Sequence, residues 1–214
     1  MQAFLLWTWF SLLLIPELAQ ENQSNALSKL KSLAPQMKIV RSQTQNEHIS
    51  LISQINLEIK GENLEQKASA FLLQYAPLFS PLFDFKVGEI QHSKQRHVVE
   101  VKAMIDGHEV VNQGLKLGFN DQNRLIILSS GLEYPKSWVP STLSADRALQ
   151  IVSKHFQINT VAHMKAKAIA LVAKQQAKGA YEIIVPNASL KDQKKVWVDG
   201  VSGEILLIQS MVWR

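Results

Sequence analysis

The stretch "GLKLGFNDQNRLIILSSGL", residues 114–132, has the pattern of two strands joined by a polar turn. Apolar residues alternate on both sides of the segment Asn120-Asp121-Gln122-Asn123, where asparagine tolerates the left-handed backbone of a turn. No combination of its side chains provides a catalytic group or a metal-ligand set. The stretch therefore raises the question whether this sheet supports an active site elsewhere in the chain or is itself the working surface.

The residues before this stretch predict further strands and one amphipathic helix. Residues 96–113 keep the strand period, and Asp106-Gly107 favours a hairpin because glycine adopts the required positive φ without strain. Residues 37–59 are rich in β-branched side chains and also read as strands. Between these segments a helix is predicted from Asn63, its N-cap, to Pro77, with Gln66 completing a capping box. Its apolar face is formed by Leu64, Ala68, Phe71, Leu72 and Tyr75.

The residues after the stretch repeat this plan. Residues 134–142 contain two prolines and are predicted to form a linker. Ser144 then caps a helix over residues 145–156, and strands follow at 168–174 and 180–185. A closing hairpin, residues 196–208, turns between Asp199 and Gly203. A helix followed by antiparallel strands, twice over, predicts an α+β chain of two modules.

Composition excludes several classes of function. A chain of 214 residues is long enough for two small domains, and its formal net charge of +5 with pI near 9.4 suggests nucleic-acid binding. The lysines are scattered, however, and no aromatic residues are interleaved with them to stack on bases, so we expect no nucleic-acid partner. The absence of cysteine excludes disulfides, thiolate metal sites and a cysteine nucleophile.

The N-terminus predicts export. The uncharged run "AFLLWTWFSLLLI", residues 3–15, would span roughly 20 Å as a helix, which suits a signal peptide better than a membrane span. Residues 1–26 are therefore interpreted as a signal peptide and polar leader, with cleavage near Ala19 or Ala26. A retained anchor is the alternative, in which case the membrane contact is made only through this segment. In both cases we expect a secreted or periplasmic protein.

No metal site or catalytic site is predicted. His108-Glu109 begins like H-E-x-x-H, but Asn112 occupies the position of the second histidine. His92 and His97 are five residues apart, so on a strand they are expected to point to opposite faces. Nucleotide-binding and nucleophile-elbow motifs are missing, and Asp199 flanks a tight turn, where aspartate more often binds its own backbone. We expect no cofactor and no enzymatic activity.

The order of these motifs resembles a known family. Residues 101–132, with the helix at 64–79 before them, resemble the FTP domain, the propeptide module of fungalysin- and thermolysin-type metalloproteases. Glu109, Val111 and Asn123 depart from its pattern, where proline, an aromatic residue and glycine are usual. The positions that fit are Gly107, Val110, Leu115, Leu117, Asn120, Leu125, Ser130 and Gly131.

The second half is similar to the PepSY domain that follows FTP in those precursors. The helix "LSADRALQIVSKHF", residues 143–156, matches its opening helix. The hairpin "VWVDGVSGEILL", residues 196–207, matches its closing hairpin, with Asp199, Gly203 and Glu204 in place. The resemblance implies an FTP-like module at 27–133, a linker at 134–142 and a PepSY-like module with its C-terminal tail at 143–214. Each module is then expected to be cystatin-like, with a helix packed on an antiparallel sheet.

The resemblance also implies a function. Propeptides of this kind assist the folding of a cognate protease and inhibit it, and no H-E-x-x-H follows in these 214 residues. We therefore expect the sheets to be the working surface of a stand-alone inhibitor or chaperone that binds a thermolysin-type zinc metalloprotease. Residues Met211, Val212, Trp213 and Arg214 are the expected protease-contacting segment. A non-catalytic envelope adaptor or ligand-binding protein, and the propeptide half of a split precursor, are the alternatives.

Overall fold

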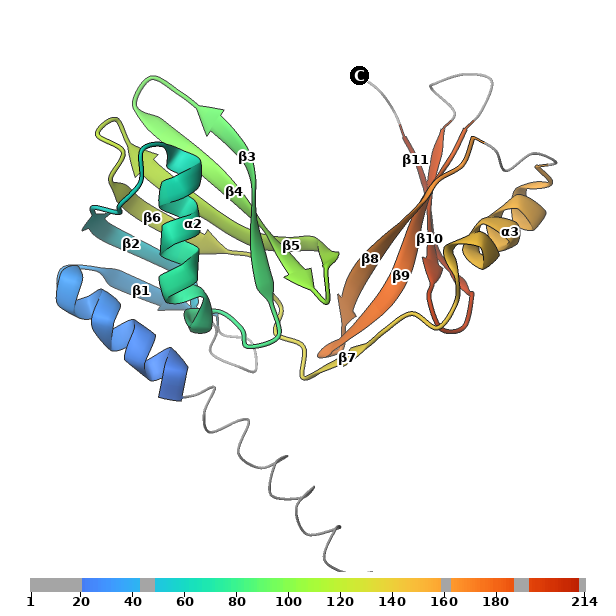
Figure 1. Ribbon diagram of the computed structural model, residues 1–214, viewed down its shortest axis with the longest axis horizontal. Coiled ribbons are helices and arrows are strands. Elements are labelled where there is room, and N and C mark those ends of the chain that lie inside the picture. Colours follow the sequence, from blue (N-terminus) through green and yellow to red (C-terminus); the bar gives the residue numbers. More distant parts are fainter. Residues whose placement is uncertain (1–20, 43–48, 159–162, 187–192, 212–214) are drawn as a thin grey trace, which may run out of the picture. The chain divides into compact units, whose positions relative to one another are not determined.

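The computed structural model describes residues 21–42, 49–158, 163–186 and 193–211. The fold is α+β and divides into two compact units (Figure 1). The first comprises the described residues up to Ala103 and those from Gln113 to Leu132, and the second comprises Met104–Asn112 and the described residues from Glu133 onward. The predicted signal segment before residue 21 lies outside the described residues. In the part of the chain that is described, no helix has both the length and the apolar character needed to cross a membrane.

The strands of the first unit form an antiparallel arrangement. β1 pairs with β2, β2 with β6, and β6 with β5, while β4 lies between β5 and β3. The turn of the β4–β5 hairpin lies in the second unit, and Asp106 and Gly107 there have φ of 50° and 76°, which confirms the predicted hairpin. The strands are β1 (Lys38–Arg41), β2 (Ile49–Leu57), β3 (Asp84–His92), β4 (Arg96–Ile105), β5 (His108–Asn120) and β6 (Leu125–Ser130).

Helix α2 (Leu64–Tyr75) crosses one face of these strands (Figure 1). The Asn63 side chain accepts a hydrogen bond from the Gln66 N–H at 2.9 Å, and Gln66 Oε1 accepts one from the Glu62 N–H at 2.8 Å. The N-cap is thus as predicted, although the return bond of the box reaches Glu62. The five residues of its predicted apolar face are all buried, and the chain continues into a short 3₁₀ helix, η1 (Ala76–Leu78).

A helix over residues 21–33 was not predicted, because its composition is mainly polar. It buries Ala26 and Leu30 on one side, four residues apart, and the Gln23 side chain donates to the Leu78 carbonyl oxygen at 2.8 Å. The end of the segment predicted as signal peptide and polar leader, residues 1–26, therefore overlaps the start of a packed helix. Cleavage after Ala26 would remove the beginning of that helix, which makes this position the less suitable of the two predicted sites.

The second unit contains β7 (Ser137–Val139), α3 (Ala145–Phe156), β8 (Ala166–Ala173), β9 (Gln176–Val185), β10 (Lys194–Asp199) and β11 (Ile205–Ser210). Strands β8, β9, β10 and β11 are neighbours in that order and antiparallel. On the other side of β8, Glu109 and Val110 from the hairpin of this unit pair in parallel with Ile169 and Ala170.

The predicted linker, residues 134–142, is ordered as part of this unit. Ser137–Val139 form β7, which pairs in parallel with the start of β9. Farther along, the N–H groups of Thr142 and Leu143 donate to the Gly200 carbonyl oxygen at 2.9 and 2.8 Å. The two prolines of this segment, Pro135 and Pro140, lie outside β7 and leave the residues between them free to pair.

Helix α3 covers one face of the sheet of the second unit (Figure 1). Ser144 caps it by accepting a hydrogen bond from the Arg147 N–H at 3.2 Å, as predicted, and Gln157 ends it with a left-handed φ of 56°. Ala148 and Val152 are fully buried against the strands. The core under the helix is completed by Met164, Tyr181, Ile183, Val185, Val196 and Val198.

Candidate functional site

Among the described residues of the second unit, no helix covers the face of the sheet opposite α3. In β9 and β10, the residues facing α3 alternate with Glu182 and Trp197, which project to the other face. On that face the Trp197 Nε1–H donates to Glu182 Oε2 at 3.1 Å, and Lys195 Nζ lies 3.2 Å from the same oxygen. This network fixes the indole and one carboxylate, so this part of the open face is rigid and polar.

The edge strand β11 lies at one side of this sheet. Among the described strands it pairs only with β10, so its other backbone edge has no strand partner there. Its sequence, ILLIQS, carries no charge, and Leu206 and Ile208 are 45% and 43% exposed. Leu206 lies on the open face near Asp199, whereas Ile208 is the register partner of Val196, a residue of the core under α3, and therefore lies on the α3 face. Edge strands are usually protected by charge, proline or a bulge. The β10–β11 register shifts between Trp197 and Val198, opposite the start of β11, but the strand has neither charge nor proline, and such an edge is a template for pairing with another chain.

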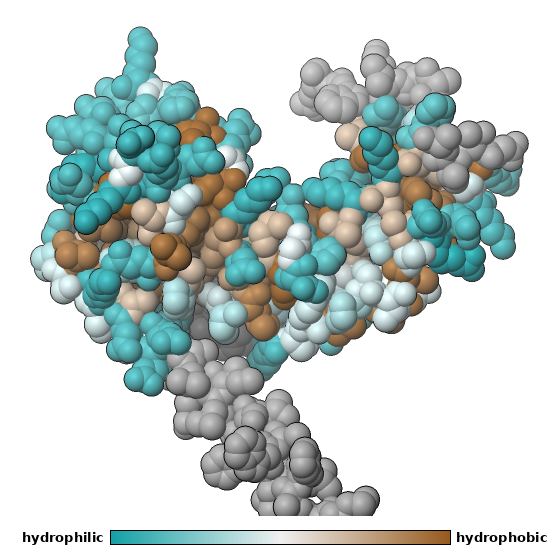
Figure 2. Space-filling model, viewed as in Figure 1, coloured by the Kyte–Doolittle hydropathy of each residue, from teal (hydrophilic) through white to brown (hydrophobic). Residues whose placement is uncertain are grey.

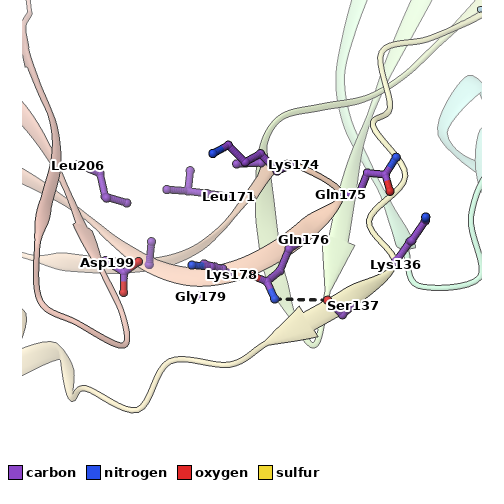
Figure 3. A pocket seen from close by; sticks show the side chains of 12 residues that line it. Lys136, Ser137, Leu171, Lys174, Gln175, Gln176, Lys178, Gly179, Asp199 and Leu206 are labelled. Carbon is purple, nitrogen blue, oxygen red and sulfur yellow. Dashed lines mark hydrogen bonds between the residues drawn. The ribbon is translucent and has the colours of Figure 1, made fainter. Parts of the chain in front are cut away.

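A pocket of about 520 Å³ lies beside β11 on the open face (Figure 3). Leu171 and Leu206 form apolar parts of its wall, and Lys174 and Lys178 project over the sheet on the same side as Leu171 (Figure 3). Lys136 contributes a third ammonium group to the lining, and within the described residues none of the three forms an ion pair. With Asp199 as its one carboxylate, the lining carries an excess of positive charge.

Asp199 has a structural task. Its Oδ1 accepts hydrogen bonds from the N–H groups of Val201 and Ser202, each at 2.8 Å, so the side chain holds its own turn as predicted. Burial acts to raise the pKa of Asp199, but the hydrogen bonds from Ser202 and Val201 and the charge of Lys178 together outweigh burial and hold the pKa below its usual value. The carboxylate is therefore ionised at neutral pH and suited to holding the turn, not to transferring protons.

Two glycines bring the chain before α3 close to this turn. A Cβ at Gly200 would overlap Ser141 Oγ and lie 2.6 Å from the Gly179 carbonyl oxygen, and a Cβ at Gly179 would lie 2.6 Å from the Ser141 backbone nitrogen. The Gly200 N–H donates to the Gly179 carbonyl oxygen at 3.0 Å. Only glycine permits this approach, which anchors one end of β10 next to the pocket.

The first unit has a separate groove between α2 and β3, with a volume of about 550 Å³. Its lining includes Leu73, which is 89% exposed, together with Phe83 and Phe85. In the view of Figure 2, hydrophobic residues form several separate patches among hydrophilic ones. Surface hydropathy alone therefore does not single out one site, and the unpaired edge of β11 is the more specific feature.

The expected protease-contacting segment is described only at its first residue. The Met211 N–H donates to the Gln193 carbonyl oxygen at 2.8 Å, which continues the β10–β11 ladder one step beyond β11. Val212, Trp213 and Arg214 lie outside the described residues. Sequence reasoning selected the tail and missed β11, whose alternation was recognised but whose position at a sheet edge depends on pairings across the whole unit.

Trp138 packs beside His108 within the second unit. It lies in β7 with its ring centroid 5.9 Å from that of His108, which belongs to the same unit. Neither Trp138 Nε1 nor His108 Nδ1 has a hydrogen-bond partner among the described residues. Glu109, beside this histidine, forms an ion pair with Lys167 at 2.8 Å, so its carboxylate already has a cationic partner.

The expectation for His92 and His97 was wrong. The two residues lie on facing strands, β3 and β4, and their Nδ1 atoms are 3.2 Å apart. The error arose because residues 84–92 were not recognised as a strand, so the two-strand hairpin that brings the rings together was missed. Across residues 21–42, 49–158, 163–186 and 193–211, no three side chains of the metal-binding types His, Asp and Glu come together.

No family model and no curated protein matches the chain. Among solved structures it is similar to the C-terminal domain of Bacillus megaterium YpeB, at 11% identity over 88% of this chain and 96% of that one, with a TM-score of 0.42. It is also similar to a candidate lipoprotein from Clostridium difficile 630, at 14% identity over 67% of this chain and 90% of that one, with a TM-score of 0.28.

Proposed function

We propose that the chain is an exported, non-catalytic protein that binds a thermolysin-type metalloprotease in trans, as an inhibitor, a folding chaperone or both. In this proposal its two units are cystatin-like modules corresponding to FTP and PepSY. The sequence pattern of residues 101–132 and 143–207 supports this assignment, as does the presence in each unit of a helix packed on antiparallel strands.

The observation that carries the proposal is the character of β11. An uncharged edge with exposed Leu206 and Ile208 can add a strand of a partner through backbone hydrogen bonds, while these side chains supply apolar contact. The ladder continues to Met211, so the same strand leads directly into the apolar tail. Met211, Val212 and Trp213 suit the apolar substrate pocket of thermolysin-type proteases, and Arg214 completes the proposed contact segment.

The test is a titration of a thermolysin-type protease with the purified chain. We expect progressive inhibition of peptide hydrolysis and a higher yield when the unfolded protease is refolded in its presence. Replacing both Leu206 and Ile208 by lysine should weaken inhibition at least about tenfold, because each lost apolar contact at an interface costs on the order of 1 kcal/mol. Deleting residues 211–214 should weaken inhibition further.

The control is Leu73→Lys, which introduces a lysine at an exposed leucine of the first unit. This variant should inhibit as the unaltered chain does. If the intact protein neither slows the protease nor raises its refolding yield, the proposal fails. If Leu73→Lys is the variant that loses inhibition, the contact surface is the groove between α2 and β3.

The positively charged pocket favours a second candidate, a binding protein for an anionic ligand. Lys174 and Lys178 have no ion-pair partner among the described residues, and Leu171 and Leu206 would hold an apolar part of such a ligand. The variant Lys174→Glu separates the candidates, because it reverses a charge of the pocket and leaves β11 intact. Inhibition that survives this change supports the edge strand, and inhibition lost with it supports the pocket. A split precursor remains the third alternative, and a protease gene beside this one would support it.

A further inference from the structure

We propose that His92 and His97 form a two-histidine site for a divalent transition-metal ion. The site lies at the end of the β3–β4 hairpin in the first unit, away in sequence from every residue assigned to protease binding. Their Nδ1 atoms are 3.2 Å apart, and their ring centroids are 5.0 Å apart with the ring planes inclined at 64°. The inference rests on this geometry and does not depend on the proposed function.

The hairpin holds the two rings in place. The Ser93 N–H donates to the Arg96 carbonyl oxygen at 2.9 Å, and the Ser93 hydroxyl donates to the same oxygen at 2.7 Å, which closes a tight turn between the histidines. His92 and His97 then face each other across adjacent strands, where side chains of a directly opposed pair come closest. His97 is half-buried and lies on the same side of β4 as the buried Val99, whereas His92 is exposed.

The separation of the nitrogens matches what a metal requires. Two imidazole nitrogens that lie 3.2 Å apart and each bind one ion at about 2.05 Å enclose an angle of about 100° at the metal, between the octahedral and tetrahedral values. In the free protein one Nδ1–H can donate to the other Nδ1. Metal binding needs both Nδ1 atoms unprotonated, so the proton of the donor ring is carried on Nε2 in the bound form and both imidazoles stay neutral.

The chemistry of the pair determines which metals are expected. Two imidazole ligands, with water completing the coordination shell, suit Cu²⁺, Ni²⁺ and Zn²⁺, with Cu²⁺ bound most tightly. Mg²⁺ and Ca²⁺ prefer oxygen ligands and should not bind. Lys94 and Arg96 in the turn carry positive charge, and no described carboxylate joins the pair to form a group of three ligands. The affinity should therefore be modest, and the bound ion should leave open positions.

The test is an NMR titration of the untagged full-length chain with Ni²⁺. Resonances of the His92 and His97 rings should broaden first and together, at one ion per chain, while those of His155 and His163 remain sharp until higher concentrations. Isothermal titration with Cu²⁺ should give the same stoichiometry, and EDTA should reverse both effects. Mg²⁺ at the same concentrations should change neither signal.

Matched variants make the result specific. His92→Gln and His97→Gln each keep a hydrogen-bonding side chain in the hairpin but remove one ligand, so each should lower the affinity at least about tenfold. His155→Gln, a histidine outside the pair, should bind as the unaltered chain does. Binding that is unchanged in both pair variants, or broadening spread equally over all six histidines, would overturn the proposal and leave the pair as a hydrogen bond only.

Discussion

At the scale of the residue, Asp199 connects a sequence pattern to a measurable electrostatic effect. The carboxylate in the D-G-V-S-G turn is held by two backbone N–H groups and lies near Lys178, so its pKa is lower in the folded than in the unfolded chain. A group whose folded pKa is lowered stabilises the fold above its unfolded pKa, and that stabilisation is lost as pH falls through the folded pKa.

Replacing Asp199 by asparagine should therefore matter at neutral pH and not in acid. Asparagine keeps an oxygen for Val201 and Ser202 but loses the charge, so the free energy of unfolding of the second unit should fall by about 1 kcal/mol near pH 7. This difference should shrink as the pH is lowered below about 4. Urea unfolding of both proteins between pH 3 and pH 7 measures it.

The control for this comparison is Asp121→Asn, in the exposed turn before β6. It should show no comparable pH-dependent difference. A stability gap between Asp199→Asn and the unaltered chain that stays constant, or widens, as the pH falls would contradict the role assigned to the Asp199 charge.

At the scale of the element, the helices begin where side-chain chemistry predicts. Replacing Asn63 by alanine removes the acceptor for the Gln66 N–H and should lower the free energy of unfolding of the first unit by about 1 kcal/mol. Ser69→Ala, at an exposed position within α2, should have no effect or stabilise slightly, because alanine favours helix more than serine. Thermal unfolding of both variants measures the difference. Equal changes in stability for Asn63→Ala and Ser69→Ala would contradict the role of Asn63 as a helix cap.

Caps and turns were predictable because their causes are local. Asn63, Ser144, Asp106-Gly107 and Asn123 each act on backbone groups within a few residues. The helix at 21–33 was missed because its polar composition hides a narrow buried stripe that includes Leu30, and only packing with distant residues reveals it. Strand β3 was missed too, and with it the pairing of His92 and His97.

The candidate site was less predictable than the elements that form it. That residues 205–210 form a strand follows from alternation, but that this strand lies at an edge depends on which strands pair with β10. Likewise β7 joins β9 across nearly forty positions of sequence. These pairings are set by the competition among strands for partners, which a short window of sequence does not contain.

At the scale of the whole molecule, the described residues form two units, each with its own helix and buried core. In the described part of the chain, neither unit brings together three metal-binding side chains. Glu182, Lys195 and Trp197 bind one another through a hydrogen bond and an ion pair. The surfaces that remain for a partner are the β11 edge, the pocket beside it and the groove of the first unit. We propose that the partner binds at the β11 edge.

Hydrogen–deuterium exchange of the intact chain, with and without an active-site-blocked thermolysin-type protease, tests this selection directly. Strand addition would place backbone hydrogen bonds on the open edge of β11, so exchange of residues 205–210 should slow in the complex while residues 64–75 exchange at an unchanged rate. Protection confined to the α2 region, or a complex in which β11 exchanges as fast as in the free protein, would contradict the account.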